Sequence, residues 1–449
     1  MSLERDPSGQ LRLGGALLAD IVHEAGTPTY AYDLEAVAVE AREMHAAFEG
    51  GAHLVAYAVK ANSAGPVVRA VAAEGCGADV VSGAELLVAL GCGIPPERIV
   101  YSGVAKRDGE IDRALACGER GIGALQVESM EEIDRVEARA RALGRRARVS
   151  VRVNPGVDVT DETHAHIATG HDAAKFGVSR DDVAVAARRV ESSQQLELVG
   201  ISAHAGSQLS SIGRYLELAR VVLGIAGDLR RAGRGRALAF VDTGGGFGID
   251  YGAPPPRRNK VAEPNGHSST PPRPADFIRA VRAEQLTSGL GDLTLCVEPG
   301  RSLVAPHGVL LARVIQAKVT RTTRWVMIDA GMNDLLRPAL YQARHRVVPL
   351  DREVDPAHGL TWRVVGPVCE SSDDFGEHPL PPEPPAAVAI LDAGAYGYTM
   401  ASTYNGRPLP AEAFIRGGVI AGRTHRVNVE TWASERIAAG EDGVPPRHH

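Results

Sequence analysis

The sequence predicts an α/β protein in which a (β/α)8 barrel of the TIM type is joined to a second, mostly β C-terminal domain. Short apolar runs rich in β-forming residues succeed one another through the first part of the chain. Most are followed by a segment with helical signals, an alternation typical of a parallel sheet covered on both faces. Eight such units in about 250 residues fit a closed barrel better than an open doubly wound sheet. After about Gly308, β-rich runs continue with few helical periods between them.

The expected barrel strands all end close to a polar residue or a glycine. In chain order they are LVAYAV ending at Lys60, ADVV before Ser82, RIVYS before Gly103, GALQV before Glu128, RVSVRV before Asn154, LVGISA before His204, AFVD before Gly244 and TLCV before Glu298.

The segments between these runs contain plausible helices. AELLVALG ends at Gly91, and SMEEIDRVEARARALG has Ser129 and Glu132 at the spacing of a capping box, with Gly144 after its last turn. These start and stop signals support the alternation of strand and helix on which the barrel prediction rests.

The second domain is predicted from runs that are β-rich throughout. They are VLLARVIQAKV, RWVMIDAG, TWRVVGPV, AVAILDAG, FIRGGVIAG and HRVNVE. We expect the barrel to occupy residues 25–305 and the β-rich domain to combine residues 1–24 with 306–449. The polar, proline-rich stretch at 253–274 is expected to be a disordered surface loop inside the barrel region.

Composition excludes several classes of function. The 449 residues carry a net charge of −6, so nothing favours binding to nucleic acid or to an anionic membrane. The charged start MSLERDPSGQ has no signal core, and no apolar run approaches the ~20 residues of a membrane span. We therefore expect a cytoplasmic protein with a small-molecule substrate. The odd number of cysteines, without zinc-site spacing, predicts reduced thiols and no metal site: Cys76, Cys92, Cys117, Cys296 and Cys369.

The unusual residues of the barrel half cluster at strand ends. Lys60, the group from His204 to Ser207, the glycines Gly244, Gly245 and Gly246, and the turn from Glu298 to Arg301 each follow an expected strand. Barrel enzymes build their sites from the loops at the C-terminal ends of the strands. Each motif alone is weak, because a triple glycine is usually only a tight turn, but four motifs at one rim predict an active site.

Ordered motifs along the chain carry a resemblance to a known family. YAVKAN, HAGSQ, GGGFGIDY, EPGRSLV, MNDLLRPALY, VCESSDDF and GAYGYTMAS occur in this order. The chain resembles the fold-type III pyridoxal-phosphate decarboxylases, and within them the diaminopimelate decarboxylase branch, from about residue 25 to residue 432. The resemblance implies an alanine-racemase-like barrel with a β domain and the decarboxylation of meso-2,6-diaminopimelate to L-lysine and CO₂, the last step of lysine biosynthesis.

The residues agree with use of pyridoxal 5'-phosphate as cofactor. A lysine at a buried strand end loses solvation and keeps a fraction of neutral amine that reacts with an aldehyde, so Lys60 is the expected anchor. Glu298 is the expected partner of the pyridine nitrogen. The resemblance implies that His204 lies on the ring face and that Tyr396 contacts the cofactor. It also implies that the phosphate is held by Ser207, Gly244, Gly245, Gly246, Gly300 and Arg301.

The substrate ends require different residues. Arg301 and Arg337 are candidates for the carboxylate that is kept, because a guanidinium holds a carboxylate with two hydrogen bonds, and the Tyr341 hydroxyl joins them. Glu370 is the candidate acceptor for the remote ammonium. Tyr396 is also expected in the substrate site. These groups would read a second amino acid end that ornithine lacks.

Cys369 is the candidate acid that returns a proton after CO₂ leaves, since a thiol titrates near working pH. The resemblance implies that Cys369 and Glu370 are contributed by the neighbouring subunit, so a homodimer is expected. The loop THAHIATGHDAAKFG, 163–177, is expected to act as a lid over the site.

Alternatives remain open at this stage. The same scaffold serves decarboxylation of ornithine, arginine or lysine, and a racemase of the same barrel would need a tyrosine base facing Lys60. A non-catalytic relative that inhibits a true decarboxylase could lose Lys60 or Cys369, but this chain has both.

Overall fold

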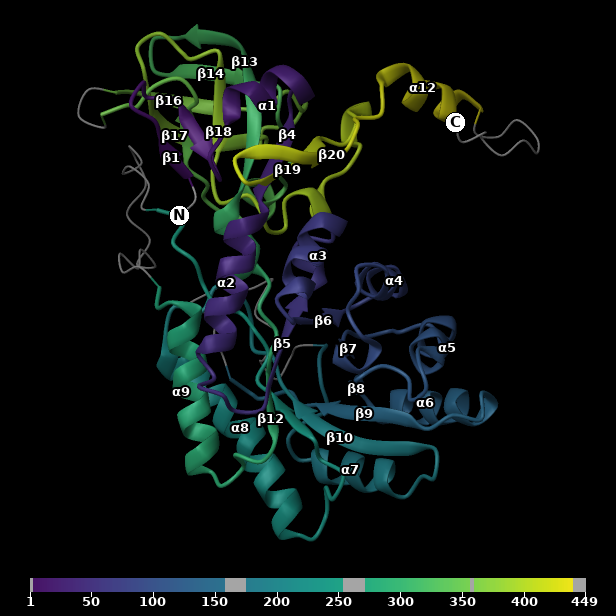
Figure 1. The fold of residues 1–449 in the computed structure, drawn as a ribbon. Helices are drawn as coiled ribbons and strands as arrows, with labels where there is room; N and C mark the ends of the chain where they lie inside the picture. Colours follow the sequence, from purple (N-terminus) through teal and green to yellow (C-terminus); the bar gives the residue numbers. More distant parts are fainter. Residues whose placement is uncertain (1–2, 158–174, 253–270, 356–358, 439–449) are drawn as a thin grey trace. The chain divides into compact units, whose positions relative to one another are not determined.

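The computed structural model describes residues 3–157, 175–252, 271–355 and 359–438 (Figure 1). The chain divides into two units, each with its own sheet system. One unit comprises residues 37–250 and 262–304, and the other comprises 1–36, 251–261 and 305–449. The expected lid lies outside the described residues up to 174, and the proline-rich stretch lies outside them from 253 to 270.

The first unit contains a closed barrel of parallel strands in the order β10-β11-β12-β5-β6-β7-β8-β9. Every neighbouring pair is parallel, including β9 with β10, which closes the ring. The predicted barrel is confirmed, and each strand overlaps one of the apolar runs read from the sequence. The strands are β5 (His53–Ala58), β6 (Gly77–Val80), β7 (Ile99–Tyr101), β8 (Ala124–Val127), β9 (Ala147–Arg152), β10 (Leu196–Ser202), β11 (Phe240–Asp242) and β12 (Thr294–Val297).

Helices lie between successive strands and surround the barrel (Figure 1). They are α2 (Leu34–Ala46), which precedes β5, followed by α3 (Gly65–Ala73), α4 (Gly83–Gly91), α5 (Asp108–Ala116), α6 (Met130–Ala142), α7 (Val183–Glu191), α8 (Ile212–Arg231) and α9 (Pro274–Thr287). The short α10 (Arg301–Val304) follows β12.

Serine caps begin three of these helices. The Ser82, Ser129 and Ser211 hydroxyls each accept the N–H three residues ahead, which satisfies a donor that the helix leaves unpaired. The cap predicted at Ser129 is therefore confirmed. The Glu132 side chain does not return to complete a capping box; it bonds the Glu128 N–H at 2.8 Å and Lys106 instead.

The barrel interior is packed with small and aliphatic side chains around one aromatic ring. These buried residues are Ala56, Val100, Ala124, Val199, Phe240 and Cys296, and Leu54 packs against them. Such a filled core closes the barrel to ligands along its axis and leaves the rim as the place for chemistry.

The second unit contains a nine-stranded sheet in which the main path runs β17-β16-β14-β13-β4-β19-β20. Its strands are β4 (Thr29–Asp33), β13 (Gly308–Val319), β14 (Arg324–Ile328), β15 (Val347–Pro349), β16 (Leu360–Val365), β17 (Asp374–Leu380), β18 (Ala387–Ile390), β19 (Ala411–Arg416) and β20 (Val419–Arg423). β18 pairs with both β13 and β15. Strand β4 comes from near the N-terminus, yet it pairs antiparallel with β13 and parallel with β19. The mostly β character predicted for this region is confirmed.

Smaller elements complete this unit. A three-stranded sheet is formed by β1 (Leu3–Arg5), β2 (Leu11–Leu13) and β3 (Ala16–Leu17). The α-helices are α1 (Leu18–Ala25), α11 (Arg337–Tyr341) and α12 (Val429–Ala438). Short 3-10 turns occur in both units: η1 (Val59–Ala61), η2 (Pro96–Arg98), η4 (Ala305–His307), η5 (Tyr398–Met400) and η6 (Tyr404–Gly406).

One expected strand is wrong. HRVNVE, residues 425–430, forms no strand, and α12 begins within it at Val429. The Arg426 guanidinium donates to the Thr27 carbonyl at 2.7 Å, and the Asn428 side chain accepts the Thr431 N–H at 2.6 Å. An N-terminal cap and a side-chain anchor therefore override the β propensity of the two valines.

The five cysteines are all free thiols. None of the helices within the described ranges is long and apolar enough to cross a membrane. No group of histidine, cysteine and acidic side chains suited to a metal ion occurs among the residues that the structure describes.

Candidate active site

The C-terminal rim of the barrel gathers buried polar side chains. Seven strands end within one residue of such a group, and all of these side chains are buried: Asp79, Ser102, Gln126, Arg152, Ser202, Asp242 and Glu298. Buried polar groups are costly unless they are paired, so their concentration at one end of an otherwise apolar barrel marks a functional rim.

Lys60 lies just beyond β5, in the 3-10 turn η1. Its ammonium is 2.7 Å from Asp79 Oδ2, and 38% of the lysine side chain is exposed while Asp79 is fully buried. The Ser102 hydroxyl donates to the other oxygen of Asp79. Burial alone would raise the pKa of Asp79, but the nearby Lys60 charge and these hydrogen bonds lower it. The lysine is therefore held by a buried carboxylate. Its side chain is more exposed than we expected for a lysine at the end of a buried strand.

Glu298 and Asp242 form a buried acidic pair at the rim. The Gln126 side-chain amide donates to Asp242 Oδ2 at 2.8 Å and to Glu298 Oε1 at 3.1 Å. Burial, followed by the charges of Asp242 and Asp79, raises the pKa of Glu298 well above its usual value. Burial also raises the pKa of Asp242. Two carboxylates in this environment require a shared proton or a cationic partner, which suits a protonated aromatic nitrogen.

His204 lies directly after β10 and contacts the glycine turn. Its Nδ1 accepts the Gly245 N–H at 3.2 Å. Burial, followed by the positive charges of Arg152 and Lys60, lowers the pKa of His204 to about 3. The ring is therefore neutral near pH 7.

The glycine turn has no room for side chains. A Cβ on Gly245 would lie 1.9 Å from the Glu298 carbonyl oxygen, and one on Gly246 would lie 2.3 Å from the Gly206 carbonyl oxygen. The Arg301 guanidinium, buried in α10, donates to the Ser207 hydroxyl at 2.8 Å. Main-chain amides without bulk, a hydroxyl and a guanidinium form a donor set that suits a phosphate group.

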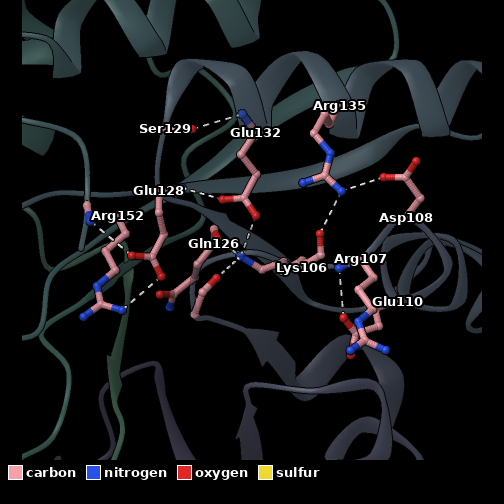
Figure 2. Close-up of polar contacts among 12 residues, drawn as sticks. Lys106, Arg107, Asp108, Glu110, Gln126, Glu128, Ser129, Glu132, Arg135 and Arg152 are labelled. Carbon is pink, nitrogen blue, oxygen red and sulfur yellow. Dashed lines mark hydrogen bonds and ion pairs between the residues drawn. The ribbon is translucent and has the colours of Figure 1, made fainter. Parts of the chain in front are cut away.

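A second polar network joins side chains and loops at the same C-terminal end of the barrel (Figure 2). Arg152 Nη1 lies 3.1 Å from Glu128 Oε1, and the other Glu128 oxygen accepts the Gly177 N–H at 3.0 Å. Figure 2 also shows the buried Lys106 ammonium, which donates to the Gly103 and Gln126 carbonyls and to Glu132 at 2.6, 2.7 and 2.9 Å. Lys106 therefore fixes the main chain of Gln126, whose side chain holds the acidic pair.

Arg337, Tyr341 and Tyr396 belong to the second unit. Arg337 begins α11, is 5% exposed, and its Nη1 lies 2.8 Å from His345 Nε2. Since an arginine can only donate, His345 accepts at Nε2 and donates from Nδ1 to the Leu391 carbonyl at 2.8 Å. Tyr341 ends the same helix, and Tyr396 has a backbone φ of 55°, a conformation rare for a tyrosine.

Cys369 and Glu370 are exposed on a loop of the same unit. The Cys369 N–H donates to Asn405 Oδ1 at 3.1 Å, and the Tyr404 hydroxyl donates to Glu370 Oε1 at 2.7 Å. The predicted residues thus form two sets. The structure brings the first set together at the barrel rim: Lys60, His204, Ser207, Gly244, Gly245, Gly246, Glu298, Gly300 and Arg301. The second set lies in the β unit: Arg337, Tyr341, Cys369, Glu370 and Tyr396.

Sequence reasoning missed Asp79, Gln126 and Asp242, along with Arg152 and its partner Glu128. A signal was available, because Asp79, Gln126 and Asp242 are single polar residues near the ends of the apolar strands GADV, ALQV and FVD, and Arg152 is the last residue of ARVSVR. Each of the four lies within one residue of the end of its strand, which places them all near the C-terminal end of the parallel barrel.

Comparisons with known proteins identify the family of this chain. The family described as "Pyridoxal-dependent decarboxylase, pyridoxal binding domain" matches residues 34–305. A diaminopimelate decarboxylase of Zymomonas mobilis is 39% identical over 94% of this chain and 96% of its own length. One from Pseudomonas aeruginosa is 38% identical over 96% of each chain.

Solved structures give the same result. Diaminopimelate decarboxylase from M. jannaschii, in co-complex with L-lysine, has a TM-score of 0.84 and 32% identity, covering 99% of this chain and 98% of its own. The Helicobacter pylori enzyme complexed with L-lysine has a TM-score of 0.80 and 35% identity, covering 94% of this chain and all of its own. A lysine/ornithine decarboxylase from Vibrio vulnificus shares the fold, with a TM-score of 0.73 at 21% identity, covering 89% of this chain and 97% of its own. The chain therefore belongs to the diaminopimelate decarboxylase family of pyridoxal-dependent decarboxylases.

Proposed function

We propose that this chain is a pyridoxal 5'-phosphate-dependent carboxy-lyase that converts meso-2,6-diaminopimelate to L-lysine and CO₂. The observation that carries the proposal is the barrel rim, where a lysine paired with a buried aspartate and a buried acidic pair lie among the donors of a phosphate site. The choice of substrate is supported by whole-length relatives that are named diaminopimelate decarboxylases.

Residues of the barrel unit hold the cofactor. Lys60 is the covalent anchor, and Asp79 fixes the position of its ammonium. Ser207, Arg301 and the amides of the 244–246 turn would hold the phosphate, and the neutral His204 ring would contact the cofactor ring.

Bound pyridoxal phosphate supplies an electron sink for the charge that develops on the substrate carbon as CO₂ departs. The protein's contribution is to keep a positive charge next to Glu298. Gln126 orients Glu298 and Asp242 from one amide, and these carboxylates would hold a protonated ring nitrogen. The buried setting strengthens this interaction relative to water.

The other residues read the far end of the substrate. Arg337 is buried and donates a hydrogen bond to His345, and its Cζ lies 4.9 Å from the centre of the Tyr251 ring. These contacts hold the guanidinium in one orientation, as a receptor for a carboxylate requires. The Tyr341 hydroxyl, at the other end of α11, joins Arg337 in this role, and Arg301 and Tyr396 are further proposed substrate-binding residues. Glu370 accepts the distal ammonium. Together these groups select a substrate with a second amino acid end.

Cys369 returns the proton. The bond between the substrate carbon and its carboxylate breaks, CO₂ leaves, and the thiol gives its proton to that carbon before it regains one from solvent. We further propose that Cys369 and Glu370 serve the active site of a second copy of the chain in a homodimer, which agrees with their exposure on this chain.

The decisive experiment is lysine formation by the purified protein, loaded with pyridoxal phosphate, from meso-diaminopimelate. LL-diaminopimelate, L-ornithine and L-lysine serve as separate comparison substrates. Turnover of the meso isomer alone, abolished in Lys60→Ala, is the expected result. Turnover of ornithine or lysine instead would retain the fold and the anchor and would refute the roles of Arg337 and Glu370.

The shared site is tested by mixing two inactive variants, Lys60→Ala and Cys369→Ala. If each site takes Lys60 from one chain and Cys369 from the other, random reassociation of a twofold dimer returns about a quarter of wild-type sites. No recovery after verified subunit exchange would place both residues in one chain.

A further inference from the structure

The loop that carries Cys369 and Glu370 is held at its tip by the short turn η6. The Tyr404 hydroxyl donates to Glu370 Oε1 at 2.7 Å, and the Asn405 side-chain oxygen accepts the Cys369 N–H at 3.1 Å. Tyr404 and Asn405, which are adjacent in η6, therefore contact Glu370 and Cys369. In the proposed function, Glu370 recognises the distal ammonium and Cys369 transfers the proton.

The base of the same loop is fixed separately. The Asp373 carboxylate is 3% exposed and accepts the N–H groups of Val368 and Met332, each at 2.6 Å. A Cβ on Gly366 would lie 2.4 Å from this carboxylate, so the main chain wraps it closely. Because the base is fixed by Asp373, the contacts with η6 act on the tip, where Cys369 and Glu370 lie.

Asn405 has an unusual backbone that suits this task. Its φ of 58° lies in the left-handed region, which asparagine tolerates better than most residues. The conformation directs the side-chain oxygen to the Cys369 N–H, a bond that spans 36 residues of sequence. Residues held in such conformations recur at functional sites.

We propose that Tyr404 and Asn405 are positioning residues for the reaction, Tyr404 acting through Glu370 and Asn405 through Cys369. This inference rests on the proposed function. Tyr404 occupies one oxygen of Glu370 and directs the other toward the distal ammonium of the substrate. Asn405 fixes the main chain of Cys369, so that the thiol delivers its proton to one face of the substrate carbon.

The charge state of the tyrosine agrees with a donor role. The hydrogen bond to Glu370, and then the charge of that carboxylate, raise the pKa of Tyr404 above its usual value. The hydroxyl therefore keeps its proton through the neutral range and continues to donate to Glu370.

The two residues predict different kinetic defects. In Tyr404→Phe, we expect KM for meso-diaminopimelate to rise about 10-fold or more while kcat stays within about twofold of the wild type. The variant loses the hydrogen bond that orients the Glu370 carboxylate, and this carboxylate binds the distal ammonium of the substrate. Tyr398→Phe, which removes a hydroxyl from the neighbouring turn η5, is the matched control and should leave KM unchanged.

Asn405 is tested by the stereochemistry of protonation. When the holoenzyme turns over in D₂O, the new C–H bond of lysine takes up deuterium in one configuration. Asn405→Gly keeps the left-handed backbone but removes the side-chain oxygen, and we expect it to give label in both configurations. Asn405→Asp retains an oxygen at the same position and should restore a single configuration.

The outcomes separate the inference from the proposed function. If the wild-type holoenzyme forms no lysine from the meso isomer, the proposed function itself fails. If the wild type is active while Tyr404→Phe keeps its KM and Asn405→Gly keeps single-configuration labelling, the positioning roles alone are refuted. A uniform loss of kcat and stability in both variants, with labelling unchanged, would show a merely structural turn and would also overturn the inference.

Discussion

Replacement of Lys106 by methionine tests the polar network at the C-terminal end of the barrel. The lysine side chain is 1% exposed, and its ammonium has three acceptors: the Gly103 carbonyl, the Gln126 carbonyl and the Glu132 carboxylate (Figure 2). Methionine fills nearly the same volume but leaves the buried Glu132 charge with only the Glu128 N–H. Removing one partner of a buried ion pair costs about 3–5 kcal/mol, so we expect the free energy of unfolding to fall by that amount.

Matched variants isolate the cause. The surface pair of Arg231 with Asp228 has a similar separation of 2.6 Å, but both side chains are more than 70% exposed, at 73% and 75%. Arg231→Met should therefore cost no more than about 1 kcal/mol. The double variant Lys106→Met with Glu132→Gln removes the unpaired charge and keeps an acceptor for Glu128, so it should regain about 1–3 kcal/mol relative to Lys106→Met.

Urea unfolding followed by circular dichroism measures these free energies, and thermal unfolding gives a second reading. A loss of 3–5 kcal/mol corresponds to a melting temperature lower by roughly 6–20 °C for a domain of this size. Equal losses of unfolding free energy in Lys106→Met and Arg231→Met would refute the reasoning, because burial would then have no influence on the contribution of an ion pair to stability.

Three further perturbations address the rim and the β unit. Asp79→Asn should lower kcat/KM for lysine formation about 10–100-fold, because the Lys60 ammonium loses a charged hydrogen bond; a change within twofold would remove Asp79 from the site. Gly245→Ala should weaken cofactor binding in fluorescence titrations, because its Cβ would overlap the Glu298 carbonyl at 1.9 Å; unchanged affinity would contradict the close approach. Burial raises the pKa of Glu412 from 4.5 to about 7, so its contribution to stability is complete below pH 4.5 and is lost as pH rises toward 7. Glu412→Gln, which keeps an acceptor for Tyr32, should remove a decline of up to ~3 kcal/mol between those pH values in chemical unfolding, whereas parallel curves for both proteins would refute the assignment.

The strands of the barrel could be predicted because their evidence is local. Each is a short apolar run that ends at a polar residue, and burial on both faces of a parallel sheet requires that pattern. The motif residues were found for a similar reason, since Lys60 and the 244–246 turn stand out from their neighbours in sequence.

The missed contacts depend on which strands become neighbours. Asp79 is separated from Lys60 by 19 residues, and Gln126 from Glu298 by 172, so no local pattern pairs them. Glu132 shows the same limit, because its spacing from Ser129 is that of a capping box while tertiary structure places Lys106 beside it. In HRVNVE, the valines suggested a strand, but Asn428 instead caps a helix.

The position of β4 has a consequence for synthesis of the protein. This strand, residues 29–33, leaves the ribosome early, but its partners β13 and β19 lie at 308–319 and 411–416. At 5–20 residues per second, the interval before the first partner emerges is on the order of 15–55 s. All eight barrel strands emerge during that interval, while the TYAYD segment, which is buried in the folded protein, still lacks both partner strands. During this period the TYAYD segment can be bound by chaperones. It can also pair wrongly with a strand of another nascent chain on a neighbouring ribosome.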